Sequence, residues 1–208
     1  NRFVRIISGA CKGRPLVSIR GWDIRPTSDR VREAIFNILG DRVRGARVLD
    51  LFAGTGALGI EALSRGAESA VFVDSRNEAL RVVRQNLTLC GFLDRARMVR
   101  RDLSRGLGPL GRSGAVFDLV FLDPPYGRGC VQPALERLAQ AGCLALHAVL
   151  VVEHDPGEPV VPDACHLRLA DQRRYGRTLV SFLEPHAGKD LEMSVLLEAQ
   201  PAEKEVDA

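Results

Sequence analysis

The chain contains 208 residues, of which 46% are hydrophobic and 26% charged, a balance typical of globular proteins. These values exclude collagen, a coiled-coil rod and wholesale disorder, and the length suits one domain with at most a small appendage. The apolar stretches fall far short of the roughly 20 residues that a membrane span needs, and the sequence opens with Asn-Arg-Phe-Val-Arg rather than an apolar signal segment. We therefore expect a cytoplasmic protein without a membrane partner. We also expect it to be a monomer.

The cysteines and histidines indicate neither a metal site nor a disulfide framework. The five cysteines are odd in number, scattered, and never spaced as C-x-x-C, so we expect small buried or half-buried hydrophobes in a reducing compartment. The four histidines are equally dispersed, and we predict no metal ligand among them. These residues are Cys11, Cys90, Cys130, Cys143 and Cys165, and His147, His154, His166 and His186.

Charge is distributed unevenly along the chain, although the net charge is only +3. Between Arg2 and Arg32 there are eight basic residues and two acids, whereas from Glu184 to Ala208 there are seven acids and two lysines. Arginine supplies 26 of the 29 basic residues, and its planar guanidinium suits phosphate groups. The basic segment therefore predicts either a nucleic-acid contact or, equally, no more than a solvated face.

The first forty residues show a hairpin pattern followed by a helix. Residues 2–20 contain two extended runs around a glycine-containing connector, which predicts a β-hairpin. Residues 25–29 indicate a turn with helix-capping side chains, and residues 30–39 place apolar side chains at a helical period. We treat residues 1–40 as one basic segment formed by this hairpin and helix.

From residue 46 onward, apolar strands alternate with helices. This alternation indicates a mostly parallel sheet that helices cover on both faces. Two later runs, 167–170 and 178–183, have no helix between them, and a hairpin there would make one edge strand antiparallel. The glycine-rich segment 104–115 predicts a surface loop. The expected strands are 47–52, 69–74, 97–101, 117–123 and 148–153, and the expected helices are 57–65, 77–89 and 131–140.

A glycine loop joins the first of these strands to the helix after it. Gly54, Gly56 and Gly59 fit the pattern G-x-G-x-x-G, in which glycine permits a tight turn and the close approach of a ligand to the backbone. Alone the pattern suits dinucleotides, other adenosine ligands and some plain strand–helix turns. Asp50 precedes the loop and could pair with a cationic group of a ligand.

Two further acids are predicted at the ends of neighbouring strands. Asp74 ends the second strand, 20 residues after Gly54, and Asp102 ends the third. A carboxylate in the position of Asp74 can accept both hydroxyls of a ribose, although it could also cap the following helix. Because ligands of open parallel sheets bind beyond the carboxyl ends of the strands, these acids together predict a site at that edge.

The fourth strand runs into Asp123-Pro124-Pro125-Tyr126. Two successive prolines fix the backbone and remove two N–H donors, which leaves a rigid row of acceptors formed by the Asp123 carboxylate and nearby carbonyl oxygens. An exocyclic amine of a nucleobase offers two N–H donors to such a row, and Tyr126 offers a ring on which the base can stack. The alternative is a proline-rich turn with a tyrosine in the core.

Together these motifs resemble the class I S-adenosylmethionine-dependent amino-methyltransferases. Asp-x-Phe-Ala-Gly-Thr-Gly at residues 50–56 and the later Asp-Pro-Pro-Tyr carry this resemblance. Residues 5–14, 25–37 and 51–67 further resemble the signatures of the RsmD family, which methylates a guanine exocyclic nitrogen in bacterial 16S ribosomal RNA. The resemblance covers about residues 2–184. It does not reach the acidic tail, which could be disordered or end in a short helix.

The resemblance implies a fold, a cofactor and a set of site residues. The fold would be Rossmann-like, α/β, with a mostly parallel seven-stranded sheet, one antiparallel edge strand and an N-terminal β-hairpin and helix. The basic segment 1–40 would contact RNA and cover the cofactor, residues 41–184 would form the methyltransferase domain, and 185–208 would be the tail. S-adenosyl-L-methionine would be held by Asp50, Phe52, Ala53, Gly54, Gly56, Asp74, Asp102 and Leu103.

The resemblance also implies how RNA would be bound. Asp123, Pro124, Pro125 and Tyr126 would hold the target guanine, flipped out of its stack. The partner would be 16S ribosomal RNA, and the resemblance favours a small subunit or assembly intermediate over naked RNA. The expected RNA-binding residues are Arg5, Lys12, Arg14, Arg25, Thr27, Arg30, Arg32 and Asn37.

Three other functions compete with this interpretation. A nicotinamide-dependent oxidoreductase would use the same glycine loop and Asp74, but it leaves Asp-Pro-Pro-Tyr unexplained. A methyltransferase for DNA adenine or a protein amide more often has asparagine in place of Asp123. A non-catalytic RNA-binding or assembly factor would not need the row of acceptors. The sequence does not identify the modified nucleotide.

Overall fold

The computed structural model describes residues 4–19, 28–108, 110, 114–125 and 127–186. The expectations for Arg25, Thr27, Tyr126 and most of the acidic tail fall outside these ranges. Within them, no helix combines the length and the apolar character needed to cross a membrane.

Seven strands form one sheet in the order β3-β2-β1-β4-β5-β7-β6. The first five strands by number run parallel, and β7 is antiparallel to both β5 and the edge strand β6. The predicted mostly parallel sheet with antiparallel pairing at one edge is confirmed; the reversed strand is β7. The strands are β1 (Arg47–Leu51), β2 (Ser69–Asp74), β3 (Ala96–Arg100), β4 (Phe117–Leu122), β5 (Leu144–His154), β6 (Leu167–Tyr175) and β7 (Thr178–Pro185).

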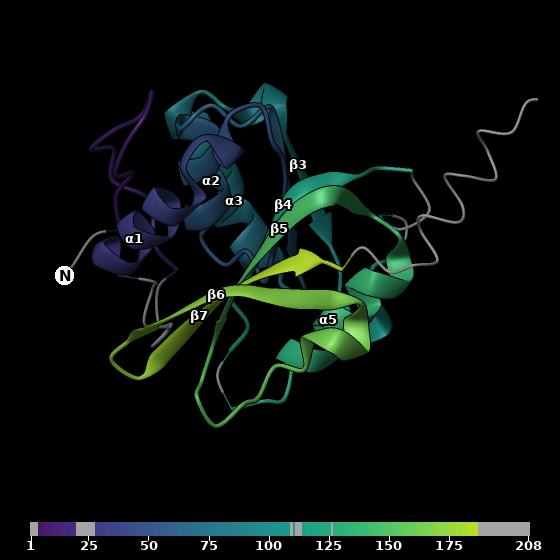
Figure 1. Cartoon of the computed structure of the whole chain (residues 1–208). Helices are drawn as coiled ribbons and strands as arrows, with labels where there is room; N and C mark the ends of the chain where they lie inside the picture. The colour runs from purple at the N-terminus through teal and green to yellow at the C-terminus, as the bar shows by residue number, and fades with distance from the viewer. Residues whose placement is uncertain (1–3, 20–27, 109, 111–113, 126, 187–208) are drawn as a thin grey trace, which may run out of the picture.

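Helices cover both faces of the sheet (Figure 1). Because successive side chains of a strand point to opposite faces, Val48 and Phe121 contribute to the core under α1, α2 and α3, whereas Leu49 and Val120 contribute to the core under α5. The bounds are α1 (Asp29–Leu39), α2 (Ala57–Ser64), α3 (Asn77–Cys90) and α5 (Val131–Ala141), with short 3-10 helices η1 (Gly40–Val43), η2 (Leu93–Arg95), η3 (Leu103–Arg105) and η4 (Pro162–Cys165).

The N-terminal segment packs into the core beneath α1–α3. Its expected hairpin is present as one antiparallel bridge, between Arg5 and Pro15, rather than as two regular strands. Val4, Ile6 and Leu16 are buried in the same cluster as the three helices. The described part of the basic segment therefore has no hydrophobic core of its own.

Two segments differ from the sequence expectation in extent. Leu107 and Leu110, inside the predicted surface loop, are buried against the α5 side of the sheet. Strand β6 is longer than its apolar run, because most of its side chains are exposed at the edge of the sheet and carry no apolar pattern.

Candidate functional site

The loop between β1 and α2 has a strained backbone at the point where the order of the strands reverses. Phe52, Gly54 and Gly56 all have positive φ values, of 59°, 56° and 78°. A bulky residue such as phenylalanine seldom adopts this conformation, and such strain gathers at functional sites. The loop lies where β2 and β4 flank β1 on its two sides, which is the usual ligand position in an open α/β sheet.

The third glycine of the motif lets α2 pack closely on β2. A Cβ atom at Gly59 would lie 2.4 Å from Cε1 of Phe72 and 3.0 Å from Oδ2 of Asp50. The backbone N–H of Gly59 instead donates to Oδ2 of Asp50, with a distance of 2.9 Å. Any larger side chain at Gly59 would separate the helix from the strand and disturb the Asp50 carboxylate.

Asp50 is a buried acid at the centre of the candidate site. Its exposed fraction is 2%, and burial raises the pKa of its carboxyl well above the ordinary value. The Gly59 N–H opposes this shift, and the negative charges of Asp123 and Asp74 add to it. The acids that follow β4 and end β2 thus act on the carboxyl of Asp50, and a cationic ligand group here would offset this repulsion.

Asp74 fastens the glycine loop to the end of β2. Its carboxylate is 4% exposed; Oδ2 accepts a hydrogen bond from Gly54 N at 3.1 Å, and Oδ1 accepts one from Arg76 N at 3.0 Å. The N-cap residue of α3 is Arg76 rather than Asp74. Oδ1 also accepts a hydrogen bond from Nε of Arg76, at 3.4 Å, so Oδ2, with one donor among the described residues, is the oxygen better placed to accept from a ribose hydroxyl.

Asp102 follows β3 but is bonded locally. Its side chain caps η3 by accepting from the N–H of Ser104 at 2.9 Å, and the hydrogen bonds from Ser104 lower the pKa of the Asp102 carboxyl. The side chain is 55% exposed. Leu103 is buried in the core on the α5 side. Asp102 is therefore placed at the expected edge, in a more solvated position than Asp50 and Asp74.

The sequence Asp123-Pro124-Pro125-Tyr126, called the acceptor motif below, begins directly after β4. Asp123 is half-buried, Pro124 is buried and Pro125 is exposed. Leu122 pairs with Val152 in the register between β4 and β5, so Asp123 comes level with Glu153, which is 3% exposed. On its other side Leu122 pairs with Leu51 of β1, which places the motif beside the glycine loop, at the same edge of the sheet.

The burial of Arg32 corrects its expected role in RNA binding. The side chain is completely buried, and Nη2 donates to the carbonyl oxygen of Arg5 at 2.6 Å and to Oδ1 of Asp29 at 2.9 Å. Burial lowers the pKa of the guanidinium, while the negative charges of Glu61, Asp29 and Glu153 act in the opposite direction. Arg32 therefore anchors α1 inside the protein and presents no donor to RNA.

The other described RNA candidates are exposed, but they lie at two different ends of the molecule. Ile19 packs against Ala79 and Val82 in the first half of α3, so the chain approaches the ligand edge at this residue. Arg5 pairs with Asp29, the first residue of α1, and Arg30 follows in the same turn. Because α1 ends near the start of β1, this first turn lies on the ligand side. Lys12 lies at the other end of the molecule. Its neighbour Cys11 donates from Sγ to the carbonyl oxygen of Cys90, the last residue of α3, at 3.2 Å. Arg14 is also exposed.

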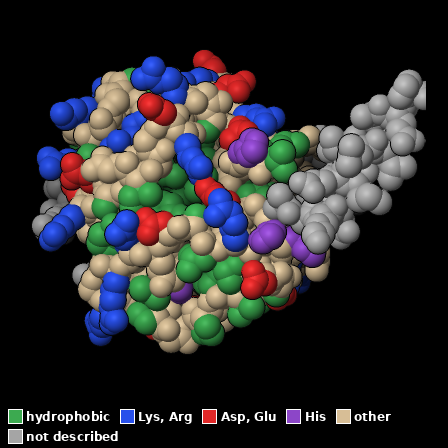
Figure 2. Space-filling model, in the orientation of Figure 1, with side chains coloured by type: hydrophobic (Ala, Val, Ile, Leu, Met, Phe, Trp, Pro, Cys, Tyr) green, Lys and Arg blue, Asp and Glu red, His purple; other side chains and the backbone are tan. Residues whose placement is uncertain are grey.

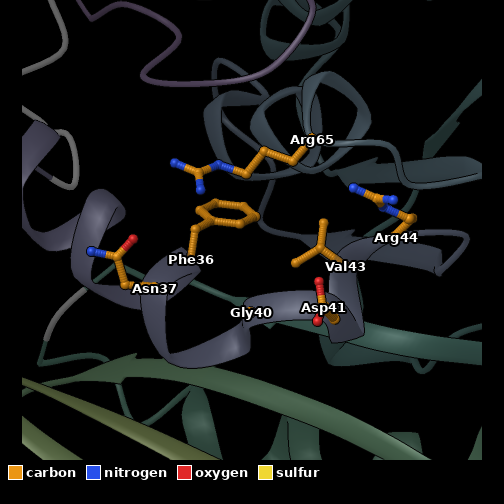
Figure 3. A pocket seen from close by; sticks show the side chains of 7 residues that line it. All are labelled: Phe36, Asn37, Gly40, Asp41, Val43, Arg44 and Arg65. Carbon is orange, nitrogen blue, oxygen red and sulfur yellow. The ribbon is translucent and has the colours of Figure 1, made fainter.

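Asn37 lines a separate surface pocket of about 290 Å³. In Figure 3 the Arg65 guanidinium extends across the Phe36 ring, 4.8 Å from the ring centroid. Because α1 and α2 both end here and β1 begins nearby, the pocket lies toward the amino ends of the strands, away from Asp50 and Asp123. Its lining residues are Phe36, Asn37, Gly40, Asp41, Val43, Arg44 and Arg65.

Two buried polar residues that support the site were missed by the sequence analysis. Glu61 in α2 accepts hydrogen bonds from the N–H groups of Ile7 and Ser8. Asn86 in α3 accepts from Val17 N and donates to the carbonyl oxygen of Thr55 in the glycine loop, at 2.9 Å. Each is a polar residue among the apolar positions of its helix, and this pattern in the sequence could have indicated a buried side chain with hydrogen-bond partners.

Comparison with known proteins agrees with this geometry. The family described as Conserved hypothetical protein 95 matches residues 4–184. The Bacillus subtilis (strain 168) protein YlbH is 38% identical over 179 residues, covering 86% of this chain and 97% of that protein. The Escherichia coli (strain K12) ribosomal RNA small subunit methyltransferase D is 38% identical over 161 residues, covering 76% of this chain and 79% of that protein.

A solved structure shares both the fold and the sequence. The Escherichia coli protein yhhF superposes with a TM-score of 0.78 and 32% identity, covering 90% of this chain and 100% of that chain. The family match over residues 4–184 includes the glycine loop, the acidic strand ends and the acceptor motif. The chain therefore belongs to the family described as Conserved hypothetical protein 95, the RsmD family of methyltransferases that its motifs resemble.

Proposed function

We propose that this protein transfers a methyl group from S-adenosyl-L-methionine to the exocyclic N2 of one guanine in 16S ribosomal RNA. The family membership and the name of the Escherichia coli relative support an activity on small-subunit RNA. The observation that carries the proposal is the position of Asp123 beside buried Asp50 and a strained glycine loop, since Leu51 pairs with Leu122 directly before the two motifs.

The residues present fit the cofactor. A buried carboxyl with a raised pKa, such as Asp50, gains from a cationic partner, and the amino group of the methionine part is one. Phe52, Ala53, Gly54 and Gly56 would enclose that part with backbone, and Asp74 would accept the ribose hydroxyls. Asp102 and Leu103 would lie beside the adenine. When bound, the cofactor supplies an electrophilic methyl carbon.

The protein's part in the reaction is to prepare the guanine amine. The lone pair of that nitrogen is delocalised into the ring, so it is a poor nucleophile. Hydrogen bonds to Asp123 and a nearby carbonyl oxygen would pull the nitrogen toward a tetrahedral shape and stabilise the positive charge that develops on it. Pro124 and Pro125 would hold these acceptors rigid, and Tyr126 would stack on the flipped base.

RNA would be gripped by basic residues around this edge. Arg30 is exposed in the first turn of α1, and Arg5, also exposed, pairs with Asp29 in that turn. Arg25 and Thr27 belong to the motif between that helix and the preceding hairpin. Lys12, Arg14 and Asn37 lie farther from the edge, so we expect them to contribute little to RNA binding. The name of the Escherichia coli relative supports the small ribosomal subunit, in the cytoplasm, as the partner of a monomeric enzyme.

Methyl transfer to defined substrates tests this function. Small subunits and naked 16S RNA are prepared from a bacterial strain that lacks the corresponding gene, and each is incubated with the protein and labelled S-adenosyl-L-methionine. We expect label in N2-methylguanosine of 16S RNA, with faster transfer to the subunit. Label in another nucleoside, or binding of NAD in place of S-adenosylhomocysteine by calorimetry, would refute the proposal.

A further inference from the structure

The β6–β7 hairpin carries arginines to the same edge of the sheet as the candidate site. His154, the last residue of β5, pairs with Leu179, and Thr178 pairs with Tyr175. The hairpin turn therefore extends beyond the carboxyl ends of the parallel strands. Figure 1 shows the hairpin projecting from the body of the molecule at the lower left.

The register fixes how far the turn lies from the acceptor motif. Asp123 is level with Glu153 on β5, Glu153 pairs with Val180 on β7, and Val180 pairs with Arg173 on β6. Since neighbouring strands are about 4.8 Å apart, three such steps place the Cα atom of Arg173 roughly 14 Å from that of Asp123. Residues 174–177 continue from this row away from the body of the sheet.

The tip of the hairpin, residues 174–177, carries two arginines that have no acidic partner among the described residues. Residues 172–178 include three arginines and no acid. Arg174 and Arg177 are exposed and form no ion pair with any residue that the structure describes; Nε of Arg174 donates to the carbonyl oxygen of Gly176. Arg173 pairs with Asp171 at 3.1 Å.

The opposite end of the same strand is different. Arg168 pairs with Glu184, which Arg42 also contacts. The two arginines at that end thus share one acidic partner, whereas Arg174 and Arg177 at the tip have none among the described residues. Figure 2 shows basic side chains gathered at the lower left, where the hairpin ends.

We propose that Arg174 and Arg177 bind backbone phosphates of the substrate RNA close to the flipped guanine. The inference rests on the proposed function. It adds a second phosphate-binding surface, on the β6 side of the acceptor motif, to the one proposed at the start of α1. Tyr175 packs against the α1–α3 core, so the tip offers guanidinium donors rather than a ring for base stacking. Such contacts position RNA without reading its sequence.

The salt dependence of binding tests the inference. Affinity for unmethylated small subunits is measured over a series of KCl concentrations for wild type, for Arg174→Ala with Arg177→Ala, and for a control with Arg84→Ala and Arg97→Ala. The control removes the same charge from exposed positions on α3 and β3. Two lost phosphate contacts should lower the slope of log affinity against log salt by about 1.4 to 1.8.

Further measurements separate this inference from the proposed function. Arg174→Lys with Arg177→Lys should restore most of the slope, and S-adenosylhomocysteine affinity should be unchanged in every variant. If wild type methylates the subunits while the alanine tip variant keeps the slope and affinity of the control, the hairpin inference is wrong. If wild type methylates no guanine, the proposed function itself fails.

Discussion

The backbone N–H of Ile7 lies 2.7 Å from Oε2 of Glu61, a completely buried carboxylate in α2. Oε1 of the same carboxylate accepts from Ser8 N at 3.0 Å and from Nε of Arg65 at 2.7 Å. The N-terminal segment is thereby fastened to the helix that follows the glycine loop. Deleting this segment would remove partners of a buried charge and disrupt the core, so its role in RNA binding is better tested by point substitutions.

Replacing Glu61 should destabilise the protein. Glu61→Ala leaves the N–H groups of Ile7 and Ser8 without their acceptor, at a cost of about 1–3 kcal/mol for each group that stays buried. Urea unfolding measures the change in free energy. Glu33→Ala, an exposed position on α1, is the control and should change stability by less than about 0.5 kcal/mol. Equal midpoints for the two variants would contradict the role assigned to Glu61.

Replacing Asp74 should weaken cofactor binding. Asp74→Ala removes the expected acceptor of the ribose hydroxyls and frees the N–H of Gly54, so the loss should be about 1.5–3 kcal/mol, the range for hydrogen bonds to charged groups. Calorimetry with S-adenosylhomocysteine measures it. Asp94→Ala, an exposed acid in η2, should bind as wild type does. Wild-type affinity in Asp74→Ala would remove Asp74 from the site.

Asp50 should couple cofactor binding to proton release. Burial raises the pKa of its carboxyl in the free protein, and a cationic partner in the complex would lower it again. Binding then expels a proton, and affinity rises with pH until pH exceeds the raised pKa, by at most about one log unit per pH unit. Calorimetry of S-adenosyl-L-methionine binding in buffers of different ionisation enthalpy measures the protons released.

Two variants separate this coupling from other titrations. Asp50→Asn keeps an oxygen that can accept from Gly59 N but cannot titrate, so the proton release should disappear. In Asp118→Asn the release should persist, because Asp118 pairs with Arg47 at the start of β1, and that bond lowers the pKa of the Asp118 carboxyl. Equal proton release in wild type and Asp50→Asn would exclude Asp50 as the coupled group.

Replacing Arg30 and replacing Lys12 should affect RNA binding differently, because the two residues lie at different ends of the molecule. Arg30 lies in the first turn of α1, near the ligand edge, whereas Lys12 lies near the end of α3. Arg30→Ala should lower the slope of log affinity against log salt by about 0.7–0.9, as expected for one phosphate contact. Lys12→Ala removes the same charge and should leave the slope nearly unchanged. A larger effect at Lys12 would reverse this assignment.

The sequence was sufficient to predict the order of strands and helices and the edge that holds the acids. Glycine spacing and apolar periodicity are local features of the sequence, and the structure agrees with both. Gly59, for example, lies where only glycine fits against Phe72. The environment of Arg32 could not be predicted in this way. Arg32 is buried because α1 packs against Arg5 and lies near Glu153. Both residues are far from Arg32 in the sequence, so no local pattern indicates the contact. The hairpin tip was missed because an exposed edge strand has little apolar pattern.

Variants of Asp123 should separate methyl transfer from cofactor binding. Asp123→Ala removes an acceptor for the guanine amine and should reduce single-turnover methyl transfer far more than S-adenosylhomocysteine affinity. Asp123→Asn keeps one carbonyl acceptor but loses the charge that stabilises the developing cation, so its rate should fall between those of wild type and Asp123→Ala. An Asp123→Ala variant with the wild-type rate would exclude this role, even if the protein methylates RNA.

Variants of Tyr126 test whether the acceptor motif also stacks the target base. Tyr126→Phe keeps the aromatic face and should retain much of the activity, whereas Tyr126→Ala should lose about 1–3 kcal/mol of base stacking. The comparison is made on single-turnover rates and on RNA affinity, with cofactor affinity measured in parallel. Because the hydroxyl has no part in stacking, equal damage in Tyr126→Phe and Tyr126→Ala would mean that the ring does not hold the guanine. The rigid acceptors at Asp123 and Pro124 would then have to position the base without it.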